Sequence, residues 1–126
     1  MNAQVLVVED NATNMKLFSI ILRKAGHEVL QAYSAEEAIA LAREHLPDLI
    51  LMDIQLPGMD GVAATRILKI DESTRRIPIV ALTALAMKGD EERMIAAGCD
   101  GYIAKPIQYK TFLEEVGRLL AGPPPP

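Results

Sequence analysis

Chemically active side chains stand directly after four short apolar segments of this chain. They comprise three carboxylates, one hydroxyl and one ammonium group: Glu9, Asp10, Asp53, Thr83 and Lys105. Carboxylates that lie close together repel one another, so a proton or a cation must neutralise part of their charge at neutral pH. An all-oxygen site suits Mg²⁺, which binds one or two carboxylates, keeps several waters and accepts phosphate oxygens. The set predicts a phosphoryl-transfer site with an aspartate nucleophile, Asp53, beside a lysine and a hydroxyl.

The segments before these side chains are typical of buried strands in a parallel sheet. Residues 49–52 are a short, wholly apolar run that ends at Asp53, and Pro57 and Gly58 follow it. Such a run, bounded by turn residues, indicates a strand that helices cover on both faces. In open sheets of this kind, ligands bind just beyond the carboxyl ends of the strands. The shared place of the five side chains, more than any one of them, indicates a common site.

Apolar segments alternate with helical patterns along the chain, which indicates repeated βα units. We expect five strands, at residues 4–8, 28–32, 49–52, 78–82 and 101–104. With right-handed crossovers, these units form an α/β, flavodoxin-like doubly wound parallel sheet in a single domain, with strand order 2-1-3-4-5. The second strand, which has mixed polarity, is expected at an edge. This order places the first and third strands together and brings Glu9, Asp10 and Asp53 close to one another.

Capping residues and apolar spacing predict the helices. Ser34 and Glu37 form a capping box for the second helix. The third helix is expected to begin at residue 60 or 61 and to turn three apolar residues inward. These three residues are Ala63, Ile67 and Ile70. The fourth helix is short and polar and ends at Gly98, and the fifth has the clearest apolar stripe.

Length, charge and cysteine content limit the classes of function. The chain has 126 residues, a formal net charge of −4 and one cysteine, Cys99. The acidic balance argues against nucleic-acid binding, which would need a basic stripe. One cysteine, no signal-peptide pattern and no apolar run near ~20 residues favour a cytoplasmic protein without membrane insertion. Residues 122–126, rich in proline, are expected to form a disordered tail after a domain of residues 1–121.

The motifs resemble the receiver domain of two-component response regulators from about Gln4 to Leu120. The motifs that carry the resemblance are Glu9-Asp10, Asp53 with residues 56–61, Thr83-Ala84 and Lys105-Pro106. Within this family, the chain is most similar to single-domain regulators of the bacterial cell cycle. That closer resemblance rests on residues 8–11, 14–18 and 87–93, and on Gly98, Cys99 and Tyr102. It implies histidine kinases as partners, and a cell pole as a location to which the protein is recruited.

The family resemblance implies a role for each motif residue. Asp53 would accept a phosphoryl group from a phosphohistidine of a sensor kinase or histidine phosphotransfer protein. Mg²⁺ would be held by Glu9, Asp10, Asp53 and the backbone carbonyl of Gln55. Lys105 would pair with the phosphoryl group, and its peptide bond to Pro106 would be cis. On activation Thr83 would turn toward a phosphoryl oxygen and Tyr102 would rotate inward, which would change a binding surface on the fourth helix, fifth strand and fifth helix.

Two positions bear on the lifetime of a phosphoryl group on Asp53. Gln55 and Leu85 flank the line along which water would attack it. A leucine side chain cannot orient water, so we expect slow self-dephosphorylation. The Leu85→Glu variant should lose the phosphoryl group on Asp53 by hydrolysis faster than wild type. The protein is then not an enzyme in the ordinary sense, since it acts only on its own phosphoryl group.

Other functions remain open. An aspartyl phosphohydrolase that depends on Mg²⁺ has a similar site, but typically carries a second aspartate two residues after the nucleophile, where this chain has Gln55. A flavin carrier on the same fold needs a phosphate-binding loop after the first strand, where Glu9 and Asp10 would repel phosphate. The chain could also be a receiver from a hybrid histidine kinase or larger regulator. We expect a stand-alone regulator that is a monomer or a weak, phosphorylation-dependent dimer.

Overall fold

Five parallel strands form the centre of the computed structural model, which describes residues 3–83 and 88–121. The strands are β1 (Gln4–Val8), β2 (Glu28–Ala32), β3 (Leu49–Asp53), β4 (Ile79–Thr83) and β5 (Gly101–Ala104). The helices are α1 (Ala12–Lys24), α2 (Ala35–His45), α3 (Gly61–Ile70), α4 (Lys88–Ala97) and α5 (Tyr109–Leu120). The strand order is β2-β1-β3-β4-β5, so the predicted doubly wound α/β sheet and the edge position of the second strand are confirmed.

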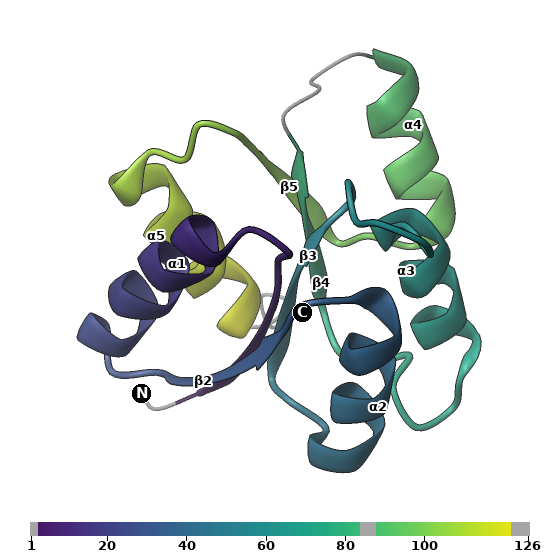
Figure 1. The fold of residues 1–126 in the computed structure, drawn as a ribbon, viewed down its shortest axis with the longest axis horizontal. Coiled ribbons are helices and arrows are strands. Elements are labelled where there is room, and N and C mark those ends of the chain that lie inside the picture. Colours follow the sequence, from purple (N-terminus) through teal and green to yellow (C-terminus); the bar gives the residue numbers. More distant parts are fainter. Residues whose placement is uncertain (1–2, 84–87, 122–126) are drawn as a thin grey trace, which may run out of the picture.

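Helices cover both faces of the sheet (Figure 1). Helices α1 and α5 lie on one face, and α2, α3 and α4 lie on the other. Successive residues of β3 alternate between the two resulting cores: Leu49 and Leu51 pack on the α1 and α5 side, whereas Ile50 and Met52 pack on the opposite side. All five residues of β3 are buried, as predicted for a strand covered on both faces.

Side-chain caps start two helices directly beside the carboxyl ends of the strands. Asn11 accepts a hydrogen bond from the N–H of Asn14 (2.9 Å) at the start of α1. Asp60 accepts one from the N–H of Ala63 (2.8 Å) at the start of α3. Because each cap satisfies an amide that has no partner within the helix, the chain turns into a helix immediately after the loop. The residues after β1 and β3 are therefore held in place from both sides.

The predicted inward face of α3 is correct at Ile67, which is partly buried and packs against the core, but it is wrong at Ile70. Ile70 is 80% exposed, and Ala63 and Ile67 are only half-buried. The residues of α3 that are buried are Gly61, Val62, Ala64, Thr65 and Leu68. Positions 61, 64, 65 and 68 have the spacing of one helix face. The first of them, Gly61, lies against the end of β3, and this contact sets which face turns to the sheet.

Some expectations concern residues outside the described ranges. Leu85 and Ala84 belong to these residues, and so does the proline-rich segment 122–126. The hypotheses about a shielded phosphoryl group and a disordered tail therefore stay predictions. Among the described residues, no helix is both long enough and apolar enough to cross a lipid bilayer.

Candidate metal and phosphorylation site

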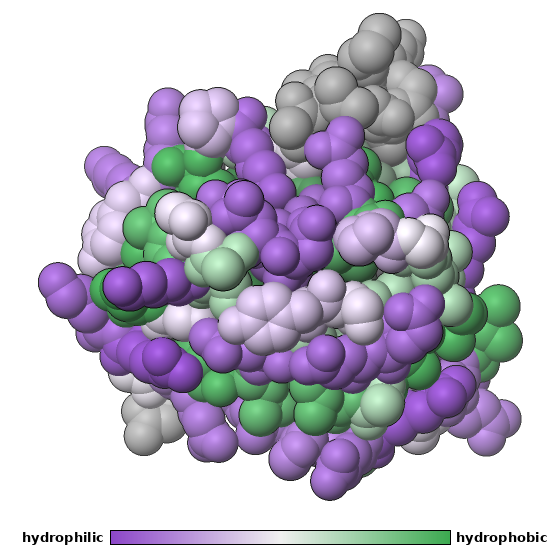
Figure 2. All heavy atoms as spheres, in the orientation of Figure 1, coloured by the Kyte–Doolittle hydropathy of each residue, from purple (hydrophilic) through white to green (hydrophobic). Residues whose placement is uncertain are grey.

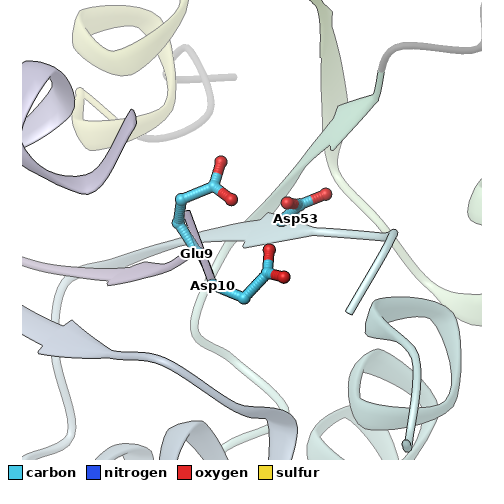
Figure 3. Close-up of side chains that lie close together, drawn as sticks. All are labelled: Glu9, Asp10 and Asp53. Carbon is cyan, nitrogen blue, oxygen red and sulfur yellow. The ribbon is translucent and has the colours of Figure 1, made fainter. Parts of the chain in front are cut away.

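The ends of β1 and β3 place three carboxylates around one space. Val8 of β1 pairs with Met52 of β3, so the residues that follow them meet at the same edge of the sheet. Carboxylate oxygens of Glu9, Asp10 and Asp53 all lie within 4.8 Å of one another. Figure 3 shows these three side chains gathered at the strand ends. Glu9 and Asp53 are 1% and 2% exposed, whereas Asp10 is open to solvent.

Lys105 reaches this cluster from the end of β5. Its Nζ donates hydrogen bonds to Oε1 of Glu9 (3.0 Å) and Oδ2 of Asp53 (3.2 Å). Burial opposes the charge on Lys105, but the hydrogen bond to Glu9 and the charges of Asp53 and Glu9 outweigh it and raise the pKa of the lysine. The lysine therefore stays protonated and balances part of the negative charge. Its peptide bond to Pro106 is cis, as the resemblance implied.

Local hydrogen bonds orient the two buried carboxylates. Oε2 of Glu9 accepts the N–H of Asn11 (3.2 Å), and Oε1 also accepts from Nδ2 of Asn14 (3.4 Å). Oδ1 of Asp53 accepts the N–H of Gln55 (2.9 Å), which leaves Oδ2 facing Lys105. Asn14 was not predicted to lie beside Glu9. The available signal was the cap at Asn11, which brings the first turn of α1 back over the end of β1.

The two proposed switch residues occupy different environments. Thr83 is fully buried at the end of β4, the strand next to β3. Tyr102 lies on the edge strand β5, opposite Ala81, and is 43% exposed. The structure thus places Thr83 beside the carboxylate cluster and Tyr102 at the surface. The switch roles that the resemblance implies for Thr83 and Tyr102 stay predictions.

The donor set of the cluster fits Mg²⁺. Its side-chain ligands are all carboxylate oxygens, which a hard divalent cation prefers over nitrogen or sulfur. Asp10 is solvent-exposed, so the cluster is open on one side to an entering ion and its waters. Figures 1 and 2 have the same orientation, and the carboxyl end of β1 lies near the middle of the view in Figure 1. Figure 2 shows hydrophilic residues on the surface at that place.

Comparisons with known proteins agree with this geometry. The family model of the response regulator receiver domain matches residues 5–117. The chain belongs to this family. It is 53% identical to the polar-differentiation response regulator DivK of Brucella ovis over 116 residues, which are 92% of this chain and 94% of that receiver protein. DivK of Brucella anthropi is 51% identical over the same length. The predicted resemblance to receiver domains and to this kind of regulator is therefore confirmed.

Solved receiver structures share the fold. A putative response regulator from Chloroflexus aurantiacus aligns with a TM-score of 0.92 at 32% identity, covering 96% of this chain and 99% of that one. The receiver domain of a sensor histidine kinase from Pseudomonas aeruginosa aligns with a TM-score of 0.90 at 36% identity, covering 97% of this chain and 100% of that one. That receiver has a magnesium ion coordinated in its active-site cleft.

Proposed function

We propose that this receiver is a stand-alone response regulator whose Asp53 accepts a phosphoryl group from a phosphohistidine on a histidine kinase or histidine phosphotransfer protein. One observation carries the proposal: the buried Asp53 lies between two further carboxylates and the ammonium of Lys105. Similarity to DivK over 94% of that protein's length supports a regulatory role of the same kind. The receiver in this proposal signals by binding other proteins and does not turn over a substrate.

The chemistry follows from the positions of the side chains. A carboxylate oxygen of Asp53 forms the new P–O bond, and the P–N bond to the donor imidazole breaks, so the imidazole leaves with that electron pair. Lys105, already hydrogen-bonded to Oδ2 of Asp53, balances the charge that gathers on the phosphoryl oxygens. Glu9, Asp10, Asp53 and the backbone carbonyl of Gln55 would hold Mg²⁺. The ion would supply further neutralisation of phosphoryl charge.

The proposed output is a change of surface on α4, β5 and α5. Phosphorylation adds between one and two negative charges and three acceptor oxygens at the end of β3. Thr83 would turn toward these oxygens, and Tyr102 would rotate inward from the edge strand. A groove of about 240 Å³ lies between β5 and α5, and Tyr102, Pro106 and Glu115 are among its lining residues. We propose this face as the site for a downstream protein, with recruitment to a cell pole as in a polar-differentiation regulator.

Intact mass spectrometry tests the proposal. Wild type is incubated with acetyl phosphate and Mg²⁺, with and without chelator, beside Asp53→Asn. The matched control is Asp48→Asn, because Asp48 precedes β3 and Asp53 ends it. We expect one phosphoryl adduct, dependent on metal, in wild type and in Asp48→Asn but not in Asp53→Asn. An equal adduct on Asp53→Asn would exclude Asp53 as the acceptor, and steady turnover of a phosphate ester would favour a phosphohydrolase.

A further inference from the structure

Gly61, the first residue of α3, lies directly against the backbone of Asp53. A Cβ atom on Gly61 would stand 2.2 Å from the carbonyl oxygen of Asp53 and 2.7 Å from Cα of Ile54. Atoms in favourable contact are about 3.5 Å apart, so any side chain here would have to separate the two segments by about 1 Å. The requirement is one of space and not of backbone torsion. Gly58 is the opposite case, with φ +75° and open space around it.

The atoms opposite Gly61 are fixed by the centre of the sheet. Asp53 pairs with Leu82 of β4, and Ile54 donates its N–H to the carbonyl oxygen of Leu82 (3.2 Å). Gly61 in turn donates its N–H to the carbonyl oxygen of Ile54 (3.2 Å). Residues 54–60 therefore leave the sheet and return to it at one point. A side chain at position 61 would open this closed loop, since the backbone of β3 cannot retreat without breaking the sheet.

We propose that Gly61 is a positioning residue for Mg²⁺, because its missing side chain sets the separation of the Asp53 carboxylate and the Gln55 carbonyl. The inference rests on the proposed function and on its assignment of these two ligands. The peptide unit between Ile54 and Gln55 is held at both ends: its N–H donates to Oδ1 of Asp53 (2.9 Å), and its carbonyl oxygen accepts the N–H of Gly61 (3.2 Å). The Gln55 carbonyl belongs to the next peptide unit, so its position follows from this one. Mg²⁺ requires nearly ideal octahedral geometry. A shift of about 1 Å in one ligand is therefore costly.

The role of Gly61 is tested with the Gly61→Ala variant, by calorimetric titration of the metal-free protein with Mg²⁺. The matched control is Gly117→Ala, because Gly117 also lies in a helix and a Cβ there would meet nothing within 4 Å. We expect the Kd for Mg²⁺ to rise at least about 10-fold in Gly61→Ala, since loss of a group that orients metal ligands typically costs about 10- to 100-fold in metal affinity. The Kd should be unchanged in Gly117→Ala. Gly58→Ala introduces backbone strain in the loop, because Gly58 has a positive φ, but its Cβ would meet no neighbouring atom within 4 Å. This variant should change the Kd less than Gly61→Ala does.

A second readout needs no metal. In the metal-free Gly61→Ala protein, the amide resonance of Gln55 should shift and its hydrogen exchange should accelerate, while amides of β1 and α5 keep their wild-type values. A purely structural role would lower the midpoint of urea unfolding and leave both the Kd and the Gln55 amide unchanged. If Gly61→Ala folds poorly, the double variant with Gly117→Ala is used, because alanine stabilises a helix relative to glycine.

Each outcome decides between the two proposals. If wild type binds no Mg²⁺, the proposed function is overturned together with this inference. If wild type binds Mg²⁺ and Gly61→Ala binds it equally well, only the role of Gly61 is overturned. If the double variant is unfolded even at low temperature, Gly61 serves the fold as a whole, and the positioning role is wrong.

Discussion

Two half-buried lysines lie near opposite ends of the strands and have nearly equal exposed fractions. Lys105 follows the carboxyl end of β5, and Lys69 of α3 contacts the segments before β4 and β5. The side chain of Lys105 is 18% exposed and that of Lys69 is 17% exposed. Each forms an ion pair with an aspartate, Lys105 with Asp53 (3.2 Å) and Lys69 with Asp100 (2.9 Å). Burial and ion pairing therefore do not separate a lysine that takes part in chemistry from one that holds the fold together.

The partners of the two ammonium groups make the difference. Lys69 donates to the backbone carbonyls of Arg75 (3.3 Å) and Ile77 (2.8 Å) as well as to Asp100. Since an ammonium has three N–H donors, these three bonds satisfy it, and two of the acceptors are fixed backbone atoms. Asp100 also accepts the N–H of Ile79 (2.9 Å). Lys69 thus joins α3, the segment before β4 and the segment before β5.

Lys105 has only side-chain acceptors among its hydrogen bonds described above. Both acceptors, Glu9 and Asp53, are carboxylates that a metal or a phosphoryl group would engage. Such partners can be exchanged when a ligand arrives, whereas backbone carbonyls inside a fold cannot. The comparison indicates that a lysine bonded to exchangeable carboxylates is the better candidate for chemistry. Variants of the two lysines sharpen or break this comparison, and a variant of an exposed ion pair gives the scale of a contact that serves neither role.

The largest effect is expected from Lys105→Ala. The rate of phosphorylation by acetyl phosphate should fall about 100- to 1,000-fold, as for removal of one donor to developing negative charge. Mg²⁺ should bind more tightly, because the ammonium no longer competes for Glu9 and Asp53. Lys110→Ala, an exposed lysine on α5, is the control and should keep the wild-type rate. Rapid phosphorylation of Lys105→Ala would remove the distinction between the two lysines.

A smaller effect, on stability alone, is expected from Lys69→Met. Methionine fills similar space but leaves the carbonyl of Ile77 and the carboxylate of Asp100 without this donor. Urea unfolding should show a loss of about 2 kcal/mol, the usual cost of an unsatisfied acceptor of this kind. The phosphorylation rate should stay at the wild-type value. A phosphorylation rate as slow as that of Lys105→Ala would show that the contacts of Lys69 also control the phosphorylation site.

The smallest effect is expected at the exposed pair Arg43–Asp71 (2.8 Å). Hydrogen bonds from the Ser73 side chain and backbone, then from Arg43, lower the pKa of Asp71 from 3.8 to about 2. Because the folded-state pKa is depressed, its stabilising contribution is present above pH 3.8 and is lost as the pH falls toward about 2. The stability of Asp71→Asn should fall less than that of wild type between these pH values, and at neutral pH it should be slightly lower than that of wild type, because the contribution of the ionised Asp71 is missing. An equally steep acid transition in Asp71→Asn would contradict this assignment.

The sequence by itself determined the strands and what stands at their ends. Short apolar runs bounded by turn residues located β1, β3, β4 and β5 within one residue, because strands covered by helices on both faces are made mainly of apolar residues. The edge strand β2 was located in spite of its mixed polarity. The flavodoxin-like arrangement of five βα units then predicted the strand order. Glu9, Asp10 and Asp53 were predictable as a cluster for this reason, since adjacent parallel strands must deliver their carboxyl-terminal residues to one edge.

Only the tertiary structure decided which chemically similar residues meet. Lys105 contacts Glu9 across 96 residues, and Lys69 contacts Asp100 across 31 residues. The place of Lys105 directly after a strand pointed to the site, but the local pattern around either lysine did not show which acceptors its ammonium group would meet. The inward face of α3 and the close approach of Gly61 to Asp53 were likewise not evident. Local sequence reports residue type and period, but contacts between distant segments depend on how each helix packs after its crossover, and that is settled only when the whole core is filled.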